Sequence, residues 1–247
     1  MAVYLGYATE DFHALVDCDL YLPEETWAQD AQRRAEAGIP EELTFRTQGE
    51  IALDLLRRTV AAGAAFKYLT ADELHGSSSE FRAGVAQLGI TDVVEVGRMT
   101  SGWTLEPRFK LPRSKPGGRP RTQLKRPPGT PAEARFWPSH RGQCLTECWL
   151  LVARSVMTCE MKYFLSNAPA DAPLETLLHV AFSRAEVEQL FEASKGEIGL
   201  DHFEVRHYLP LVRHLIVSLA SLLFLEEQTQ RLEKKLLVER EPGARGA

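Results

Sequence analysis

The sequence has few cysteines, and their scarcity excludes several classes of protein. Its 247 residues include only Cys18, Cys144, Cys148 and Cys159, and these lack the paired spacing of a disulfide framework or a zinc site. We therefore interpret all four as reduced cytosolic thiols. Residues 1–17 contain no basic segment followed by a long apolar core, so no signal peptide is predicted.

Long uninterrupted apolar segments are also missing. The longest, residues 209–225, contains Pro210, Arg213 and His214, which leaves fewer than the ~20 apolar residues needed to span a bilayer. We expect a buried helix here and no membrane partner. The composition, 44% hydrophobic and 26% charged, is typical of a globular protein with one sizeable core.

Basic residues are not in excess, because the net charge is −5, but they are unevenly distributed. Residues 108–126 contain no acid, so the rest of the chain is strongly acidic. This basic tract could contact phosphates or form a solvated linker, and the sequence leaves both interpretations open. The tract contains Arg108, Lys110, Arg113, Lys115, Arg119, Arg121, Lys125 and Arg126.

Short apolar segments alternate with helical patterns in the first hundred residues. Residues 2–8 and 13–21 predict two strands joined by a hairpin connection, and a short helix is expected around residues 27–37. Residues 47–50 form a capping box, which predicts the start of a longer helix.

Gly63 is expected to end that helix. Strands at 66–71 and 92–96 then flank a helix at 79–88. A helix between two short strands predicts that these strands are parallel.

The second half of the chain begins with a break in this pattern. Prolines and glycines in residues 100–143 exclude regular structure there. Residues 148–154 and 161–166 predict the two strands of a hairpin. A helix is expected from Pro173, and a second capping box at 183–186 predicts that another helix begins at Ser183.

The chain ends with a predicted long helix at about residues 209–237. The tail, residues 241–247, is expected to be disordered. We assign residues 1–240 to one domain with an insert at about 100–170.

Asp72 is the first candidate catalytic residue. It follows the predicted strand 66–71, and ligand sites in α/β proteins lie at the carboxyl ends of strands. An aspartate in this place could equally form a cap or turn.

Glu188 is the second candidate. At 100° per residue, Arg184, Glu188 and Lys195 lie on one side of the predicted helix, beside an apolar stripe. The alternative is an ordinary Arg–Glu pair on a helix surface. Carboxylates from separate elements would suit phosphoryl transfer with two divalent metals, because the protein must hold both ions.

Several motifs carry a resemblance to a known family. The spacing Arg184-x3-Glu188-x6-Lys195 resembles the R, E and K of the YREK signature of a large group of DDE transposases. The run KGEIGLDHFEVR, residues 195–206, is similar to the stretch that follows this glutamate in a subgroup of insertion-sequence transposases.

Three upstream segments resemble the same subgroup in the same order. They are residues 17–23, 45–47 and 70–76, with the sequences DCDLYLP, FRT and TADELHG. The resemblance extends over about residues 3–225.

The resemblance implies an RNase H-like α/β fold, with a mixed sheet flanked by helices, a small β-hairpin and proline-rich basic insert, and a long C-terminal helix. It implies that Asp72 and Glu188 bind Mg²⁺ or Mn²⁺ as the second and third catalytic acids. Arg184 and Lys195 would contact DNA, and we add the basic tract through Arg113, Lys115, Arg119 and Arg121. It further implies cleavage and joining of transposon ends in double-stranded DNA by a bacterial, nucleoid-associated cytoplasmic enzyme, homodimeric when intact.

The sequence departs from the family pattern at three places. Ala181 stands where the signature has tyrosine, and Ala185 where an aromatic often follows the arginine. The first catalytic aspartate should end a strand that comes before residues 2–8, and Asp11, Asp17 and Asp19 are poor substitutes because they come later.

We therefore expect an N-terminally truncated transposase that is inactive as this chain. Two alternatives remain open. One is a non-catalytic DNA-binding remnant of a transposase, and the other is a metal-dependent nuclease in which a different acid replaces the missing one.

Overall fold

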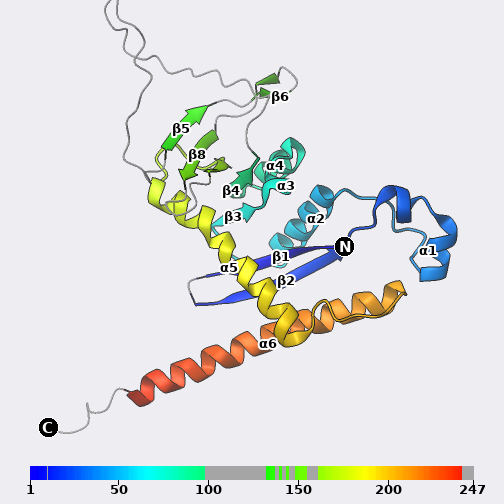
Figure 1. Cartoon of the computed structure of the whole chain (residues 1–247). Coiled ribbons are helices and arrows are strands. Elements are labelled where there is room, and N and C mark those ends of the chain that lie inside the picture. Colours follow the sequence, from blue (N-terminus) through cyan, green and yellow to red (C-terminus); the bar gives the residue numbers. More distant parts are fainter. Residues whose placement is uncertain are drawn as a thin grey trace, which may run out of the picture. The chain divides into compact units, whose positions relative to one another are not determined.

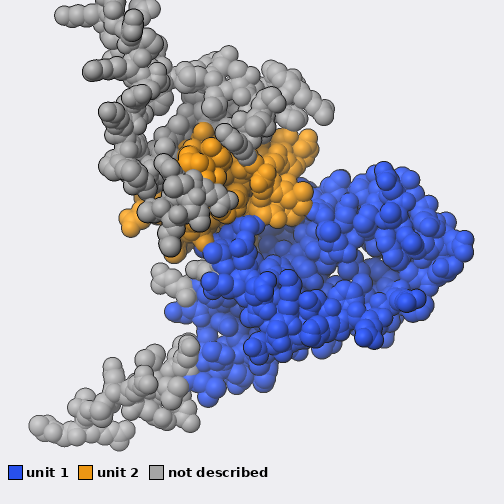
Figure 2. Space-filling view, in the orientation of Figure 1, with its two compact units in different colours: residues 1–65, 183–247 blue, residues 66–182 orange. Residues whose placement is uncertain are grey.

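The chain consists of two compact units, which Figure 2 shows in blue and orange. A computed structural model describes residues 1–9, 11–97, 132–136, 139–140, 143–144, 148–154 and 161–240. Unit 1 contains Met1–Ala65 and Ser183–Ala247, and unit 2 contains Phe66–Phe182. Each unit is described by itself.

Unit 1 is built around an antiparallel hairpin, as predicted. Strands β1 (Ala2–Ala8) and β2 (His13–Leu20) pair along their whole length, with an irregularity between Leu5 and Gly6. Helices cover both faces of this hairpin (Figure 1). On one face Val3 packs against Ile51 and Leu55 of α2, and on the other β2 packs against α6.

One helix of unit 1 begins at a predicted cap. Helix α2 (Gln48–Ala61) starts at the capping box, in which the Glu50 amide donates to Thr47 Oγ1 at 3.2 Å and the Thr47 amide donates to Glu50 at 2.7 Å. Gly63 follows the helix with φ +80°. The short helix expected around 27–37 is a π-helical turn, η1 (Glu24–Ala28), followed by α1 (Ala31–Ala37).

Unit 2 contains a five-stranded sheet in the order β3-β4-β9-β8-β5. The strands β3 (Tyr68–Ala71) and β4 (Thr91–Val96) are parallel, as predicted. Two helices connect them, α3 (Glu73–Gly76) and α4 (Ser79–Gln87). The predicted hairpin strands are confirmed as β8 (Cys148–Arg154) and β9 (Met161–Ser166), and β9 pairs antiparallel with β4, which makes the sheet mixed.

The expectation that residues 100–143 lack regular structure is wrong for the end of that segment. Strands β5 (Ala132–Phe136), β6 (Ser139–His140) and β7 (Gln143–Cys144) form there. Proline and glycine are concentrated before residue 132, whereas β5 contains neither and pairs antiparallel with β8. Residues 98–131, including the basic tract, lie outside the described residues.

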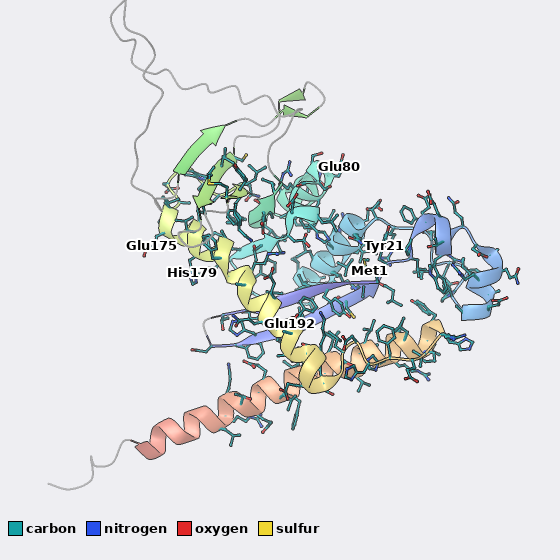
Figure 3. All side chains as sticks on the ribbon, viewed as in Figure 1. Met1, Tyr21, Glu80, Glu175, His179 and Glu192 are labelled. Atoms are coloured by element: carbon teal, nitrogen blue, oxygen red, sulfur yellow. The ribbon has the colours of Figure 1, made fainter. Side chains whose placement is uncertain are left out.

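Helix α5 (Leu174–Ile198) is continuous, so the prediction that a helix begins at Ser183 is wrong. No proline or glycine interrupts residues 174–195, and extending an existing helix costs less than nucleating another one. Figure 3 shows its side chains, with His179 in the unit 2 part and Glu192 in the unit 1 part. In unit 2, Leu177 and Ala181 pack on the sheet beside Val93 and Phe164.

The C-terminal helix α6 (Tyr208–Arg240) has nearly the predicted bounds, but the expectation that it is buried is wrong. Among the described side chains of α6, only one side packs, because the hairpin and α5 contact the face that contains Leu215 and Leu222. By length and composition alone, its segment Tyr208–Leu232 could cross a membrane, and 17% of the most apolar window in that segment is buried.

These elements confirm the predicted fold class. The protein is a mixed α/β chain with a mixed sheet flanked by helices and a long C-terminal helix, consistent with an RNase H-like fold. The assignment of residues 1–240 to one domain stays a prediction.

A buried carboxyl group joins two strands of the sheet in unit 2. Asp92, only 2% exposed, accepts from the Asn167 amide at 2.9 Å, and Asn167 Oδ1 accepts from the Asp92 amide at 2.8 Å. Burial raises the pKa of Asp92 from 3.8 to about 6, against the opposing effects of the Asn167 amide and the Arg82 charge. Ionised Asp92 therefore costs stability in the folded protein.

We expect Asp92→Asn to stabilise unit 2 at pH 7 and to leave it unchanged near pH 4. Because the folded pKa is raised, the folded state holds more protons between about pH 4 and 6, and stability falls as pH rises through that window. Two pKa units correspond to about 3 kcal/mol, and asparagine keeps an oxygen for the Asn167 amide. Amide exchange of β4 at both pH values measures the effect, and a less stable variant at pH 7 would contradict it.

Candidate active site

Asp72 lies at the carboxyl end of β3, where the sequence predicts a ligand site. It is the N-cap of α3, and its Oδ1 accepts from the His75 amide at 3.0 Å. The same oxygen lies 2.8 Å from His75 Nδ1. The Asp72 side chain is 42% exposed. The structure thus combines both interpretations of this residue, because it caps a helix and also presents a carboxylate to solvent at a strand end.

His75 holds the Asp72 carboxylate in place. Its side chain is 15% exposed, and its ring packs edge-on against Phe81, with the ring centroids 5.4 Å apart. A bond to the carboxylate requires the proton on Nδ1. Within the described part of the chain, the buried Nε2 has no hydrogen-bond partner. The His75 ring can bond to Asp72 in only one orientation, with Nδ1 toward the carboxylate, and the ring of Phe81 packs against it in that orientation.

Gly76 brings this turn close to β4. A Cβ atom at Gly76 would lie 2.0 Å from the carbonyl oxygen of Glu95 and 3.0 Å from Val94 Cβ, so only glycine fits between α3 and β4. The Gly97 amide also donates to Ser77 Oγ at 3.2 Å, which ties the end of β4 to the same turn. Three residues of the motif TADELHG thus have separate structural roles. Asp72 caps α3, His75 holds the Asp72 carboxylate, and Gly76 allows the close contact with β4.

Glu188 lies on the unit 1 part of α5, with its side chain 62% exposed. Arg184 donates to it from one turn earlier, so the expected Arg–Glu pair is present. Lys195 lies on the same side of the helix and is 3.9 Å from Glu192, its nearest acidic partner among the described ion pairs. This side of the helix therefore contains two exposed carboxylates, Glu188 and Glu192, and two cations.

The neighbouring side of α5 is fixed on the hairpin by the predicted apolar stripe. The methyl groups of Val187 lie over Gly6, Leu190 is buried, and the ring of Phe191 packs edge-on against Tyr4 at 5.2 Å between centroids. These contacts determine which side of the helix faces outward and so place Glu188 at the surface.

The two departures from the signature on α5 have different surroundings. Ala181, which stands where a tyrosine is expected, is 3% exposed in the core of unit 2, so a tyrosine there would need a rearranged core. Ala185 is exposed.

Two of the acids considered as substitutes for the first catalytic aspartate are engaged by arginines. Asp17 Oδ2 accepts from Arg58 at 3.0 Å, and Asp19 Oδ2 accepts from Arg46 at 2.8 Å. These pairs join β2 to α2 and to the segment before it, and they give the carboxylates a structural role.

Asp72 and Glu188 belong to different units, each described by itself. Within the described ranges, no three His, Cys, Asp or Glu side chains are grouped so as to hold a metal ion. The predicted DNA-contacting residues Arg113, Lys115, Arg119 and Arg121 lie outside the described residues.

Residues 1–143 match the family model of the DDE superfamily endonuclease. The chain belongs to this family. A comparison with curated proteins finds no match. Membership implies a DNA substrate and transposase-like cleavage and joining of DNA, and enzymes of the family typically use a divalent metal.

The region matched by the DDE endonuclease model includes Asp72 and ends before α5. It also includes the segments DCDLYLP, FRT and TADELHG that carry the resemblance. The family assignment therefore rests on a part of the chain that is independent of the YREK spacing, and the roles of Arg184, Glu188 and Lys195 stay predictions.

Sequence reasoning missed three residues of this endonuclease domain. It assigned no role to His75 or Gly76, although both lie in the quoted motif, and it did not pair Arg46 with Asp19. The i,i+3 spacing of Asp72 and His75 could have indicated the clamp, because residues so spaced are neighbours on a helical turn. No sequence signal identifies the contact between Arg46 and Asp19, which is set by tertiary packing.

Proposed function

We propose that the chain is most of the catalytic domain of an insertion-sequence transposase of the YREK group, and that Asp72 and Glu188 are two of its three catalytic acids. The observation that carries this proposal is the position and environment of Asp72. Asp72 is an exposed carboxylate at a strand end, oriented by His75 inside the region that matches the DDE endonuclease family.

The donors that this proposal requires are suited to Mg²⁺ or Mn²⁺. Mg²⁺ binds carboxylate oxygens and keeps several waters, and both acids are exposed enough to admit a hydrated ion. A bound pair of such ions would activate the attacking oxygen and stabilise the leaving oxygen of an in-line displacement. The contact with His75 would orient the Asp72 carboxylate before a metal binds, so the carboxylate would not need to reorient on binding.

Arg184 and Lys195 would contact DNA phosphates beside Glu188. Lys195 is 47% exposed and Arg184 26% exposed on the same side of α5, and their ion-pair partners, Glu192 and Glu188, are exposed acids within one turn. Such surface pairs contribute about 0.3–0.5 kcal/mol, so a phosphate or a metal on Glu188 could displace them. Arg113, Lys115, Arg119 and Arg121 would extend this contact along the DNA.

The first acid would come from a strand outside this chain. In the RNase H-like order this strand lies between the second and fourth strands, which here are β1 and β3. Among the described residues, β1 pairs only with β2, and β3 pairs only with β4. Each thus has one edge at which a further strand could pair. The chain alone would then be inactive and prone to association.

The test is DNA cleavage by the chain extended with the in-frame codons upstream of Met1. The substrate is duplex DNA that contains the ends of the element around the gene. We expect Mg²⁺-dependent cleavage by the extended chain and none by the chain from Met1. Glu188→Gln should lower the rate by more than the roughly 10–100-fold lost when groups beside a metal ligand are changed.

Glu192→Gln is the matched control, because Glu192 is an exposed acid one turn from Glu188 and is not proposed to bind a metal. It should retain nearly full activity. If the extended chain binds the ends but never cuts them, the protein is a DNA-binding remnant. If the chain from Met1 cuts DNA by itself, another acid replaces the first one and the truncation proposal is wrong.

A further inference from the structure

Helix α6 has a second apolar face that the unit 1 core does not cover. Its buried side packs on the hairpin through Leu215 and Leu222. On another side, large apolar side chains face solvent with exposed fractions between 40% and 64%. These residues are Leu209, Ile216, Val217, Leu223 and Phe224. A helix with two apolar faces requires a second partner for stable burial in water.

The spacing of the exposed residues is that of helix-on-helix packing. Leu209, Ile216 and Leu223 follow one another at intervals of seven, and Val217 and Phe224 repeat the same interval. A seven-residue repeat keeps an apolar stripe aligned with a second, supercoiling helix. This interval is about two helical turns, so it aligns the five side chains on one face, as packing against a second helix requires.

We propose that this face binds α6 of a second copy of the chain, antiparallel, with the two-fold axis at Ala220. A two-fold axis places residues equally distant from Ala220 opposite each other. Ile216 then faces Phe224 and Val217 faces Leu223 of the partner helix. The alanine, which is exposed in the middle of the stripe, lets the two helices approach closely where they cross.

The charges on the same face support the antiparallel orientation. Arg213 and Glu227 are exposed, and each lies seven residues from Ala220, so the axis places them opposite each other. Within its own chain Glu227 lies 3.8 Å from Arg231, a contact that exposed side chains can exchange for one with a partner. A parallel pair would instead place Arg213 on Arg213 and Glu227 on Glu227. This inference depends on α6 alone and not on the proposed DNA chemistry.

Charge reversal tests the proposal. Sedimentation equilibrium of the whole chain should show a dimer, and Arg213→Glu or Glu227→Arg should each raise the dissociation constant at least about tenfold, because each creates two like-charge contacts. The double variant should recover most of the wild-type affinity. A monomeric wild type, or a double variant as weak as the two single changes combined, would overturn the proposal.

Disulfide trapping tests the register. Ala220→Cys places both thiols at the axis and should give a covalent dimer on oxidation, above the level of wild type. Arg231→Cys, on the same face, is the control. Residue 231 lies eleven residues from the axis, so in the antiparallel dimer its two copies are about 33 Å apart, too far to form a disulfide. Preferential cross-linking through residue 231 would show parallel helices and overturn the proposal. So would a wild-type chain that binds vesicles of neutral lipid and does not self-associate.

Discussion

Replacing Gly76 with alanine should strongly destabilise the sheet of unit 2. The new Cβ would lie 2.0 Å from the carbonyl oxygen of Glu95 and close to Val94 Cβ. Both neighbours belong to β4, which is hydrogen-bonded on both sides, to β3 and to β9, so neither can move without disturbing two ladders. Overpacking of a well-packed site costs about 1–3 kcal/mol, and we expect the upper end here because the clash is with backbone.

Gly196→Ala is the matched control. Gly196 lies on α5, and a Cβ there would meet no atom within 4 Å. Alanine should therefore stabilise the helix by about 0.5–1 kcal/mol. Amide exchange of β4 should become much faster in Gly76→Ala and stay unchanged in Gly196→Ala. Slow exchange of β4 in the Gly76 variant would show that α3 can shift away from β4 at little cost.

Changes at Asp72 should separate its two roles. Asparagine is as good an N-cap as aspartate, so Asp72→Asn should keep α3 and the stability of unit 2 nearly intact. It removes the negative charge that a divalent cation requires, so we expect a loss of Mg²⁺-dependent cleavage of at least about 100-fold in the extended chain.

Asp72→Ala removes both roles and should also lower stability by about 1 kcal/mol, which is the usual value of a cap. The comparison of the two variants distinguishes a metal ligand from a capping residue. If Asp72→Asn cuts DNA at the normal rate, Asp72 is only a cap. Thermal unfolding followed by circular dichroism provides the stability measurement.

The parts of the fold predicted from sequence are those set by local pattern. The capping box at Thr47, the parallel strands β3 and β4 and the hairpin strands β8 and β9 were all predicted, because each has its own periodicity and stop signals. The false helix start at Ser183 shows the limit of this reasoning. The same residues that form a capping box also continue a helix, and the packing of Leu177 and Ala181 on the sheet decides between the two.

The site was predictable only as far as residue type and position along an element allow. Asp72 was found because a carboxylate at a strand end is visible in sequence. The clamp by His75 and the tight contact at Gly76 depend on how far α3 lies from Phe81 and β4, which no local pattern fixes. The exposed face of α6 was missed for a related reason, since an apolar run looks the same whether one or two sides are buried.

Our proposal that Asp72 and Glu188 are both catalytic acids predicts that each lies beside a bound divalent metal. Iron-directed cleavage of the polypeptide tests it most directly. Fe²⁺ replaces Mg²⁺ in the extended chain, and ascorbate and peroxide then generate radicals that cut the backbone beside the bound ion. We predict cuts close to both residue 72 and residue 188, suppressed by excess Mg²⁺ and lost in Glu188→Gln. Cuts at neither position would contradict the proposal that both acids bind the metals. So would cuts at only one position that persist in Glu188→Gln.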